Sequence, residues 1–188
     1  MKDFLKHSLE YIGELVRVVL LSLAIILPVR YFLVQPFYVK GASMEPNFYD
    51  HEYLIIDEIS YRFQDPSRGD IVVFRYPADP SQFFIKRVVG LPGETMVIKD
   101  GKVRIISVAY PDGRILEESY LSSDIFTYGE KKTTLGADEY FVLGDNRMSS
   151  LDSRHFGILS KSLIIGRVWL RGWPPERLAR FLEPAYNL

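Results

Sequence analysis

The sequence predicts a mainly β protein, an antiparallel sheet or barrel-like domain preceded by one transmembrane helix. Three observations support this prediction. One strongly apolar run ends near residue 34, and the chain after it contains many short β-branched and aromatic runs bounded by Gly, Pro and Asp. After the apolar run, only residues 175–182 show a helical pattern. Many short strands with little helix are typical of open or closed antiparallel barrels, and 188 residues suffice for one such domain plus an appendage.

The apolar run extends from Leu15 to about Val34 and contains Arg17 and Arg30 near its ends. A bilayer requires about 20 helical residues, so the span works over residues 12–31 if both arginines reach the interfaces. This predicts a short N-terminal segment over 1–11, an anchor over 12–31 and a β domain over 32–188. A buried core helix and a cleavable secretory signal are the alternatives. The charge bias across the run is too slight to set an orientation.

Strands are expected at 53–57, 70–76, 83–89, 96–98, 102–106, 139–143 and 163–171. Asp100-Gly101 is a two-residue hairpin signal, and Pro111-Asp112-Gly113 predicts a further turn. The polar stretch 107–136 is expected to form a small lobe away from the functional site. Pro174 and Pro175 stand where a helix over 175–182 would begin.

Composition excludes several classes of function. The formal net charge is −1, from 23 basic and 24 acidic residues, which gives no reason to expect nucleic acid as a partner. The absence of Cys rules out thiol chemistry and Cys-built zinc sites, and it fits a chain that works outside the cytoplasm without disulfides. His7, His51 and His155 lack metal-ligand spacing. No metal or cofactor is therefore expected.

The most suggestive local motif is Gly41-Ala42-Ser43-Met44-Glu45-Pro46, in which a hydroxyl lies beside residues with almost no side chain. Taken alone it is weak, because most loop serines are simply solvated. A nucleophilic serine needs a general base. His51 or His155 could be that base, but neither lies in a known catalytic motif. The other known partner is a Lys neutralised by burial. Lys86 interrupts an apolar strand pattern, although by pattern alone a Lys pointing to water is favoured.

Four ordered motifs together resemble a known family, and their residues are Ser43-Met44-x-Pro46, Arg68–Phe74, Ile85–Gly93 and Gly144–Arg147 with Ser150, Asp152, Ser153 and Arg154. They resemble bacterial type I signal peptidase, the membrane-bound Ser-Lys protease that cuts signal peptides from exported proteins. With the apolar segment before them, the resemblance covers most of the chain. Four motifs in the right order are far more specific than any one of them.

The resemblance assigns roles to individual residues. Ser43 would be the nucleophile, with its backbone N–H as an oxyanion donor, and Lys86 the general base. Ser150 would hydrogen-bond the Lys86 amine. Asp152 and Arg154, with Arg87 nearby, would form a structural ion pair, and Asp145 and Asn146 would hold their loop through backbone bonds. His155 is interpreted as a packing residue. Gly41 replaces a serine of many Gram-negative members, so the second oxyanion donor is missing and a water would take its place.

The resemblance also predicts how a substrate binds. An extended peptide would add as a strand beside residues 39–42 and 83–85. Contacts are expected from Gly41, Ala42 and Phe84, and Val39, Met44 and Ile85 would line shallow pockets. Such pockets would favour Ala-like residues at the first and third positions before the cut.

The implied location is the bacterial cytoplasmic membrane, with a single span and the catalytic domain on the extracytoplasmic side. The implied partners are preprotein signal peptides, the lipid bilayer and the export machinery. A specialised Ser-Lys maturation peptidase with a narrow client stays open as an alternative. A catalytically silent β domain that binds exported chains is disfavoured by Ser43, Lys86 and Ser150. A self-cleaving repressor is disfavoured by the apolar segment and the absence of a DNA-binding helix pair.

Overall fold

The computed structural model describes residues 2–32, 35–122, 125–181 and 186–188. Side chains are described from residue 11 to 27 and, within those ranges, from residue 36 onward. The chain forms two compact units, Met1–Gln35 and Pro36–Leu188. Each unit is described separately below.

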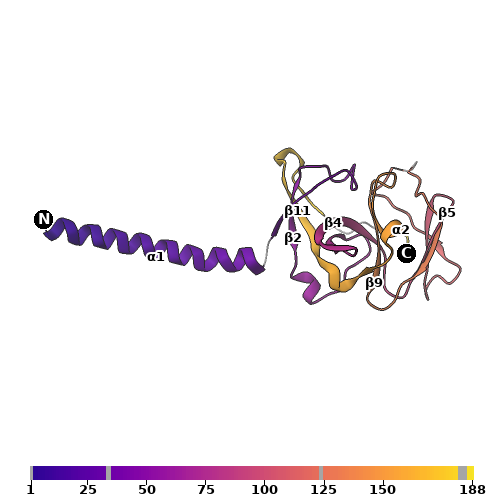
Figure 1. Ribbon diagram of the computed structural model, residues 1–188, viewed down its shortest axis with the longest axis horizontal. Helices are drawn as coiled ribbons and strands as arrows, with labels where there is room; N and C mark the ends of the chain where they lie inside the picture. The colour runs from indigo at the N-terminus through magenta and orange to yellow at the C-terminus, as the bar shows by residue number, and fades with distance from the viewer. Residues whose placement is uncertain (1, 33–34, 123–124, 182–185) are drawn as a thin grey trace. The chain divides into compact units, whose positions relative to one another are not determined.

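The first unit consists mainly of helix α1 (Lys2–Phe32), drawn in indigo and purple in Figure 1. Every side chain from Tyr11 to Leu27 is exposed, including a run of leucines, isoleucines and valines. Across the described residues, no helix is both long enough and apolar enough to cross a membrane. The predicted span over 12–31 is therefore not confirmed by the structure.

The larger sheet of the second unit is antiparallel in its described pairs. Its strand order is β1-β2-β11-β3-β4-β9-β10, with β12 paired to β11. The strands are β1 (Gln35–Tyr38), β2 (Tyr53–Asp57), β3 (Ile71–Tyr76), β4 (Asp79–Gly90), β9 (Glu139–Leu143), β10 (Leu159–Ser160), β11 (Ile164–Trp173) and β12 (Ala179–Arg180). In the described part of the chain this path does not close on itself, so the sheet is open rather than a closed barrel.

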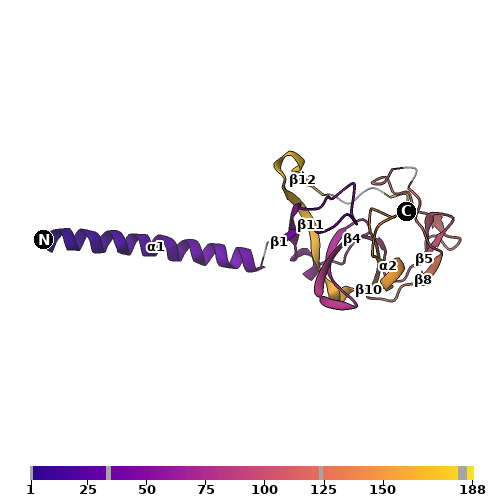
Figure 2. The ribbon, with the colours of Figure 1, turned by 45° about the horizontal axis from the view of Figure 1, so that its top comes forward.

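The smaller sheet has the order β7-β6-β5-β8 and contains β5 (Thr95–Lys99), β6 (Lys102–Ile106), β7 (Arg114–Ile115) and β8 (Lys131–Thr134). Figure 2 shows β5 and β8 side by side in this sheet. The hairpin between β5 and β6 turns at Asp100 and Gly101, which both have positive φ angles, 51° and 75°. A tight turn with two positive φ values matches the right-handed twist of the flanking strands. The predicted hairpin is confirmed.

Strand β3 explains how the core surrounds the functional site. Its residues Ile71 to Phe74 are all buried, because alternate side chains enter two different apolar clusters. Val72 and Phe74 belong to one cluster and Ile71 and Val73 to the other. The neighbouring strand β4 is buried from Lys86 to Gly90, so a polar residue in that half of the strand has little access to water.

The strand predictions agree with the structure to within a few residues. The helix prediction for 175–182 is wrong over residues 175–181, and residue 182 lies outside the described residues. Residues Pro175–Arg177 form a single 3₁₀ turn, and the chain then returns as β12 along β11. The Arg171 guanidinium donates to the Arg177 carbonyl oxygen at 2.8 Å and fixes this return. A one-turn helix, α2 (Ser153–Phe156), was not predicted; Asp152 caps its N-terminus by accepting from the Arg154 amide.

The expected lobe over 107–136 does not lie away from the site. Strands β7 and β8 belong to the smaller sheet, and the segment between them contacts residues next to the Ser43 motif. The Asn47 side-chain amide donates to the Tyr120 carbonyl at 3.0 Å, and the Arg87 guanidinium lies over the Tyr120 ring. This lobe therefore supports the loops that carry the candidate residues.

Candidate active site

Ser43 lies in a compact turn between β1 and β2. Met44 and Phe48 are fully buried in the core, and the Phe48 amide donates to the Met44 carbonyl, so the turn is anchored beneath the serine. Gly41 has a φ of 87°, and its N–H donates to Asp50 Oδ1 at 2.9 Å. A glycine is required here because other L-residues rarely adopt this conformation. The Ser43 side chain is left half-exposed on an anchored turn.

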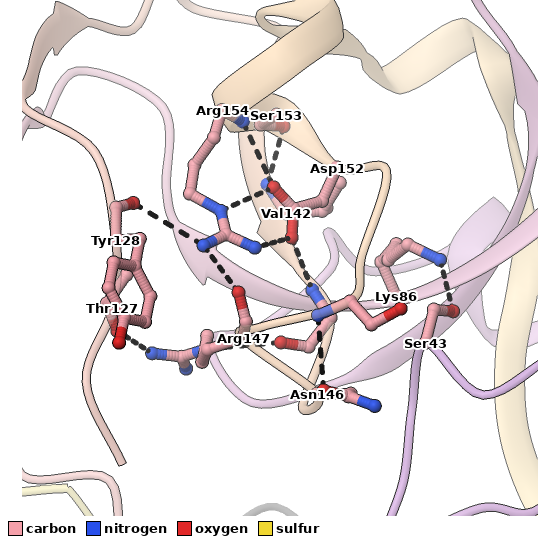
Figure 3. Close-up of polar contacts among 12 residues, drawn as sticks. Ser43, Lys86, Thr127, Tyr128, Val142, Asn146, Arg147, Asp152, Ser153 and Arg154 are labelled. Atoms are coloured by element: carbon pink, nitrogen blue, oxygen red, sulfur yellow. Dashed lines mark hydrogen bonds and ion pairs between the residues drawn. The ribbon is translucent and has the colours of Figure 1, made fainter.

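Lys86 lies on β4 with only 3% of its surface exposed, opposite Val72 of β3. Its Nζ is 2.7 Å from Ser43 Oγ and 2.7 Å from the Ile85 carbonyl oxygen. Figure 3 shows the two side chains meeting end to end. The structure thus brings together the serine and the lysine that were expected to act as a pair, from positions 43 residues apart.

Burial lowers the pKa of Lys86 to about 8, because desolvation disfavours the ammonium form. The negative charges of Asp152 and Asp145 act in the opposite direction but do not cancel this effect. With a pKa of about 8, roughly one tenth of the amines are neutral at pH 7, whereas an ordinary Lys would be neutral in fewer than about one in a thousand molecules. The site therefore maintains a usable population of free amine.

The loop after β9 holds the serine segment in place through Asn146. Its backbone N–H donates to the Ser43 carbonyl oxygen at 3.1 Å, and its side-chain amide donates to the Ala42 carbonyl at 3.0 Å. Asn146 was expected to stabilise its own loop, and this cross-link was not predicted. At Gly144, a Cβ atom would overlap both the Ser150 hydroxyl and the Ser43 carbonyl oxygen, which explains the glycine there.

Two buried ion pairs lie under this loop, and one differs from the expectation. Arg87 pairs with Asp145, not with Asp152, through bonds of 2.8 and 2.6 Å. Asp145 also accepts from the Asn47 side chain at 2.8 Å, so it holds more than its own loop. Asp152 pairs with Arg154 through two bonds of 2.9 and 2.8 Å, as expected.

The Asp152 carboxylate is completely buried and also accepts from the Gly144 amide at 3.0 Å. Burial works against its ionisation, but the hydrogen bonds and charge of Arg154 outweigh burial and lower the pKa of Asp152. Asp152 is therefore a permanent anion that fixes the loop after β9 to helix α2 (Figure 3).

The Ser150 hydroxyl, expected to hydrogen-bond the Lys86 amine, does not do so here. Its oxygen is buried beside Gly144 and has no hydrogen-bond partner in the parts of the chain that the structure describes. It lies close to the Asp152 carboxylate without a bond of ordinary geometry. An unpartnered buried hydroxyl is costly in free energy, so its place beside the Ser43 carbonyl calls for an explanation.

A cavity of about 410 Å³ opens beside Ser43 and Lys86. Its walls come from the β1–β2 segment, from β3 and β4 and from the loop after β9; they are Phe37, Tyr38, Val39, Lys40, Ser43, Leu54, Val73, Gln82, Phe83, Phe84, Ile85, Lys86 and Leu151. Val39, Phe84 and Ile85 line it as expected, and Leu151 was not predicted. Met44 does not line it, because its side chain is 1% exposed and packs into the core. Gly41 and Ala42 lie in the adjoining turn rather than on the cavity wall.

One side of β4 is unpaired next to this cavity. Strand β4 pairs with β3 from Asp79 onward, but its described pairing with β9 begins only at Arg87. The backbone of residues 79–86 thus presents an unpaired edge on the side away from β3. An unpaired strand edge can accept an added extended peptide.

The two candidate histidines have other surroundings. His51 is exposed, contacts the Tyr38 hydroxyl, and its Nε2 lies 3.3 Å from Asp50 Oδ2. His155 is exposed on α2, so its interpretation as a packing residue is wrong. Among the described residues, neither histidine forms a hydrogen bond to Ser43 or Lys86.

This arrangement, a hydroxyl hydrogen-bonded to a buried amine beside a strand edge, is that of a peptidase, and comparisons with known proteins identify its family. A family model described as "Signal peptidase, peptidase S26" matches residues 12–173. The chain belongs to this signal peptidase family.

Two curated relatives agree with this assignment. Signal peptidase I of Leptolyngbya laminosa is 39% identical over 91% of this chain and 84% of its own length. Probable signal peptidase I-2 of Synechocystis sp. is 35% identical over 92% of this chain and 78% of its own length. A solved signal peptidase I from Enterococcus faecalis V583 is 31% identical, has a TM-score of 0.47, and covers 56% of this chain and 97% of its own.

Proposed function

We propose that this chain is a membrane-anchored serine endopeptidase that removes N-terminal signal peptides from exported proteins, with Ser43 as nucleophile and Lys86 as general base. The observation that carries the proposal is the 2.7 Å contact between Ser43 Oγ and a buried Lys86 Nζ whose pKa is lowered to about 8. Membership of the signal peptidase family supports the substrate class.

In the first step the neutral Lys86 amine accepts the Ser43 hydroxyl proton while Ser43 Oγ attacks the scissile carbonyl carbon. The new C–O bond converts the carbonyl oxygen to an oxyanion. When the C–N bond breaks, the Lys86 ammonium gives its proton to the departing amine, which becomes the N-terminus of the mature protein. The signal peptide is left as an ester on Ser43. A water molecule then attacks the ester carbonyl carbon while its proton passes to Lys86. The bond between that carbon and Ser43 Oγ breaks, the signal peptide leaves with a free carboxyl group, and the Lys86 ammonium returns the proton to Ser43 Oγ.

The Ser43 backbone N–H is proposed to donate to the oxyanion. In the described residues no acceptor for this N–H is found, whereas Asn146 donates to the carbonyl oxygens of both Ala42 and Ser43. The Gly41 N–H is already used by Asp50, so a water is the proposed second donor. One backbone donor lost from an oxyanion site costs about 10²–10³ in kcat in related chemistry.

Ser150 is proposed to position Lys86 rather than to contact the substrate. Its buried hydroxyl has no hydrogen-bond partner in the described ranges, so it is available to the amine when Lys86 changes its protonation state. Asp152 and Arg154 support the same loop through their ion pair. Asp145 and Arg87 support it from beneath.

The signal peptide is proposed to add to the free edge of β4 in extended form, opposite the segment 39–42. Val39, Phe84 and Ile85 then form the walls that the residues before the cut would touch. The cavity is shared among several bulky apolar side chains, which supports a preference for small residues at the first and third positions before the bond.

Membrane anchoring through residues 12–31, with the domain over 32–188 on the extracytoplasmic side, is part of the proposal. It is supported by the exposed apolar side chains of α1 between Tyr11 and Leu27, which no described packing covers. Extraction of membranes with alkaline carbonate should leave the full chain in the pellet. Release into the supernatant would contradict the anchor.

The function is tested by cleavage of a preprotein in detergent with the full-length wild-type chain and with Ser43→Ala. Wild type should release the mature protein with a new N-terminus after a small residue, and Ser43→Ala should give none. Ser149→Ala is the matched control, because Ser149 is exposed on the neighbouring loop. Near wild-type turnover by Ser43→Ala would exclude Ser43 as the nucleophile.

A further inference from the structure

A second cavity, of about 420 Å³, is lined by residues that follow Ser43 in the sequence. Glu45 and Pro46, which follow Ser43 by two and three residues, form part of its wall. Asn146, which holds the Ser43 and Ala42 carbonyls, forms another part. This cavity shares no lining residue with the one beside Val39 and Ile85. The two cavities therefore adjoin Ser43 through residues that precede it and residues that follow it.

An endopeptidase must hold a substrate that continues on both sides of the scissile bond. If the residues before the bond occupy the cavity beside β4, the residues after it leave toward Glu45 and Pro46. We propose that the second cavity binds the first residues of the mature protein and selects a basic side chain over an acidic one. This inference rests on the proposed function and adds a specificity site to it.

The aromatic wall of the cavity is built from Phe126 and Tyr128, whose ring centroids lie 4.7 Å apart. Both rings are about half exposed, at 47% and 50%, so their faces are available to a ligand. The segment between them is fixed: the Thr127 hydroxyl accepts from Arg147 at 2.6 Å, and the Thr127 amide donates to the Gly101 carbonyl at 2.9 Å. Figure 3 shows Thr127 and Tyr128 of this segment beside Arg147, which belongs to the loop after β9.

The charge of the cavity comes from Glu45. Two other charged residues line it, but Asp145 is neutralised by Arg87 and Arg147 by Glu118, and both are almost completely buried. Within the described part of the chain, the partly exposed Glu45 carboxylate has no ion-pair or hydrogen-bond partner. A carboxylate next to aromatic faces attracts a Lys or Arg side chain and repels an acidic one.

The distance along the chain indicates which substrate residue is selected. Two residues span at most about 7 Å, so Glu45 lies within that reach of Ser43. An extended substrate advances about 3.3 Å per residue. The first two residues after the cut therefore lie within reach of Glu45, and the test below varies the second of them.

The test uses the full-length protein in detergent and three preprotein substrates that differ only in the second mature residue, which is Lys, Gln or Glu. Wild type should cleave the Lys substrate with a kcat/KM about fivefold above that of the Glu substrate, the combined effect expected of an exposed charge pair and a cation–π contact. The ratio should decrease as salt is raised. Glu45→Gln should bring it close to one, and Glu45→Lys should invert it.

Inversion by Glu45→Lys is a result that misfolding alone does not produce. Glu130→Gln is the matched control, since Glu130 is exposed near the same segment but does not line the cavity, and it should keep the wild-type ratio. If Glu45→Lys does not fold, the salt dependence of the wild-type ratio decides. Equal kcat/KM for the Lys and Glu substrates with wild type would overturn the inference. The Ser43–Lys86 proposal would survive that result, because Ser43→Ala alone decides it.

Discussion

If Lys86 is the general base, as proposed, the pH dependence of cleavage follows its titration, since only the free amine can accept the Ser43 proton. With a pKa of about 8, its neutral fraction is about 1% at pH 6, about 9% at pH 7 and about 90% at pH 9. We expect kcat/KM to rise by about ninetyfold between pH 6 and pH 9 and then to level off. A lysine of ordinary pKa would still gain about eightfold from pH 9 to pH 10.

The assay is initial-rate cleavage of one uncharged reporter preprotein by the full-length chain in detergent, from pH 6 to pH 10. Lys86→Arg should be inactive across the range, because a guanidinium stays charged and cannot act as a base. The loss in kcat should be about 10²–10⁴-fold or more, which is the range that a general base typically contributes. Lys99→Arg, at an exposed position, should keep the wild-type profile.

A flat profile for wild type, or a rise that continues through pH 10, would refute the role of burial in lowering the pKa of Lys86. Retention of more than a trace of activity by Lys86→Arg would remove Lys86 as the base. In that case His51 and His155 would have to be tested, although both are exposed and neither contacts Ser43 in the described structure.

Three further predictions concern the residues around this pair. Lys86→Met should be inactive but more stable than wild type. The pKa of Lys86 is 10.5 in the unfolded chain and about 8 in the folded chain, so folding is penalised by about 3 kcal/mol below pH 8. This penalty decreases as the pH rises from 8 and disappears above 10.5. Thermal unfolding at pH 7 and pH 10 checks this, and an equal or lower Tm at pH 7 would contradict it. Asp145→Ala should lower stability by about 3–5 kcal/mol, because it leaves the buried Arg87 charge without its partner; an unchanged midpoint in denaturant would count against the pair. Ser150→Ala should reduce kcat more than it raises KM, since the role proposed for Ser150 is to position Lys86 and not to hold substrate; an unchanged kcat with a large increase in KM would contradict that role.

Much of the fold could be predicted from local sequence patterns. The Asp100-Gly101 turn and the strands beside it follow from residue types that tolerate positive φ and from β-branched runs. One exception is residues 175–181, where the interaction of Arg171 with the Arg177 carbonyl and pairing with β11 determine the backbone. Tertiary contacts of this kind leave no local signal.

The Ser43 and Lys86 pair could be predicted only through the resemblance to a family, because the pattern around Lys86 also fits a strand-edge lysine. Burial on β4 against the apolar strand β3 is a property of the sheet order, which periodicity does not give. The same holds for Asn146, because its contact with Ser43 joins two loops that are 103 residues apart in the sequence. The pairing of Arg87 with Asp145 was missed for this reason as well.

Acylation of Ser43 is the measurement that tests the central claim most directly. The full-length protein is mixed with a signal-peptide substrate, quenched in acid so that Lys86 is protonated and deacylation stops, and analysed by intact-mass and peptide mass spectrometry. We expect a mass increase equal to the acyl portion of the signal peptide, on the peptide that contains Ser43, and none in Ser43→Ala. An adduct on a different residue, or an adduct of the same mass that persists in Ser43→Ala, would contradict a Ser43 nucleophile activated by Lys86.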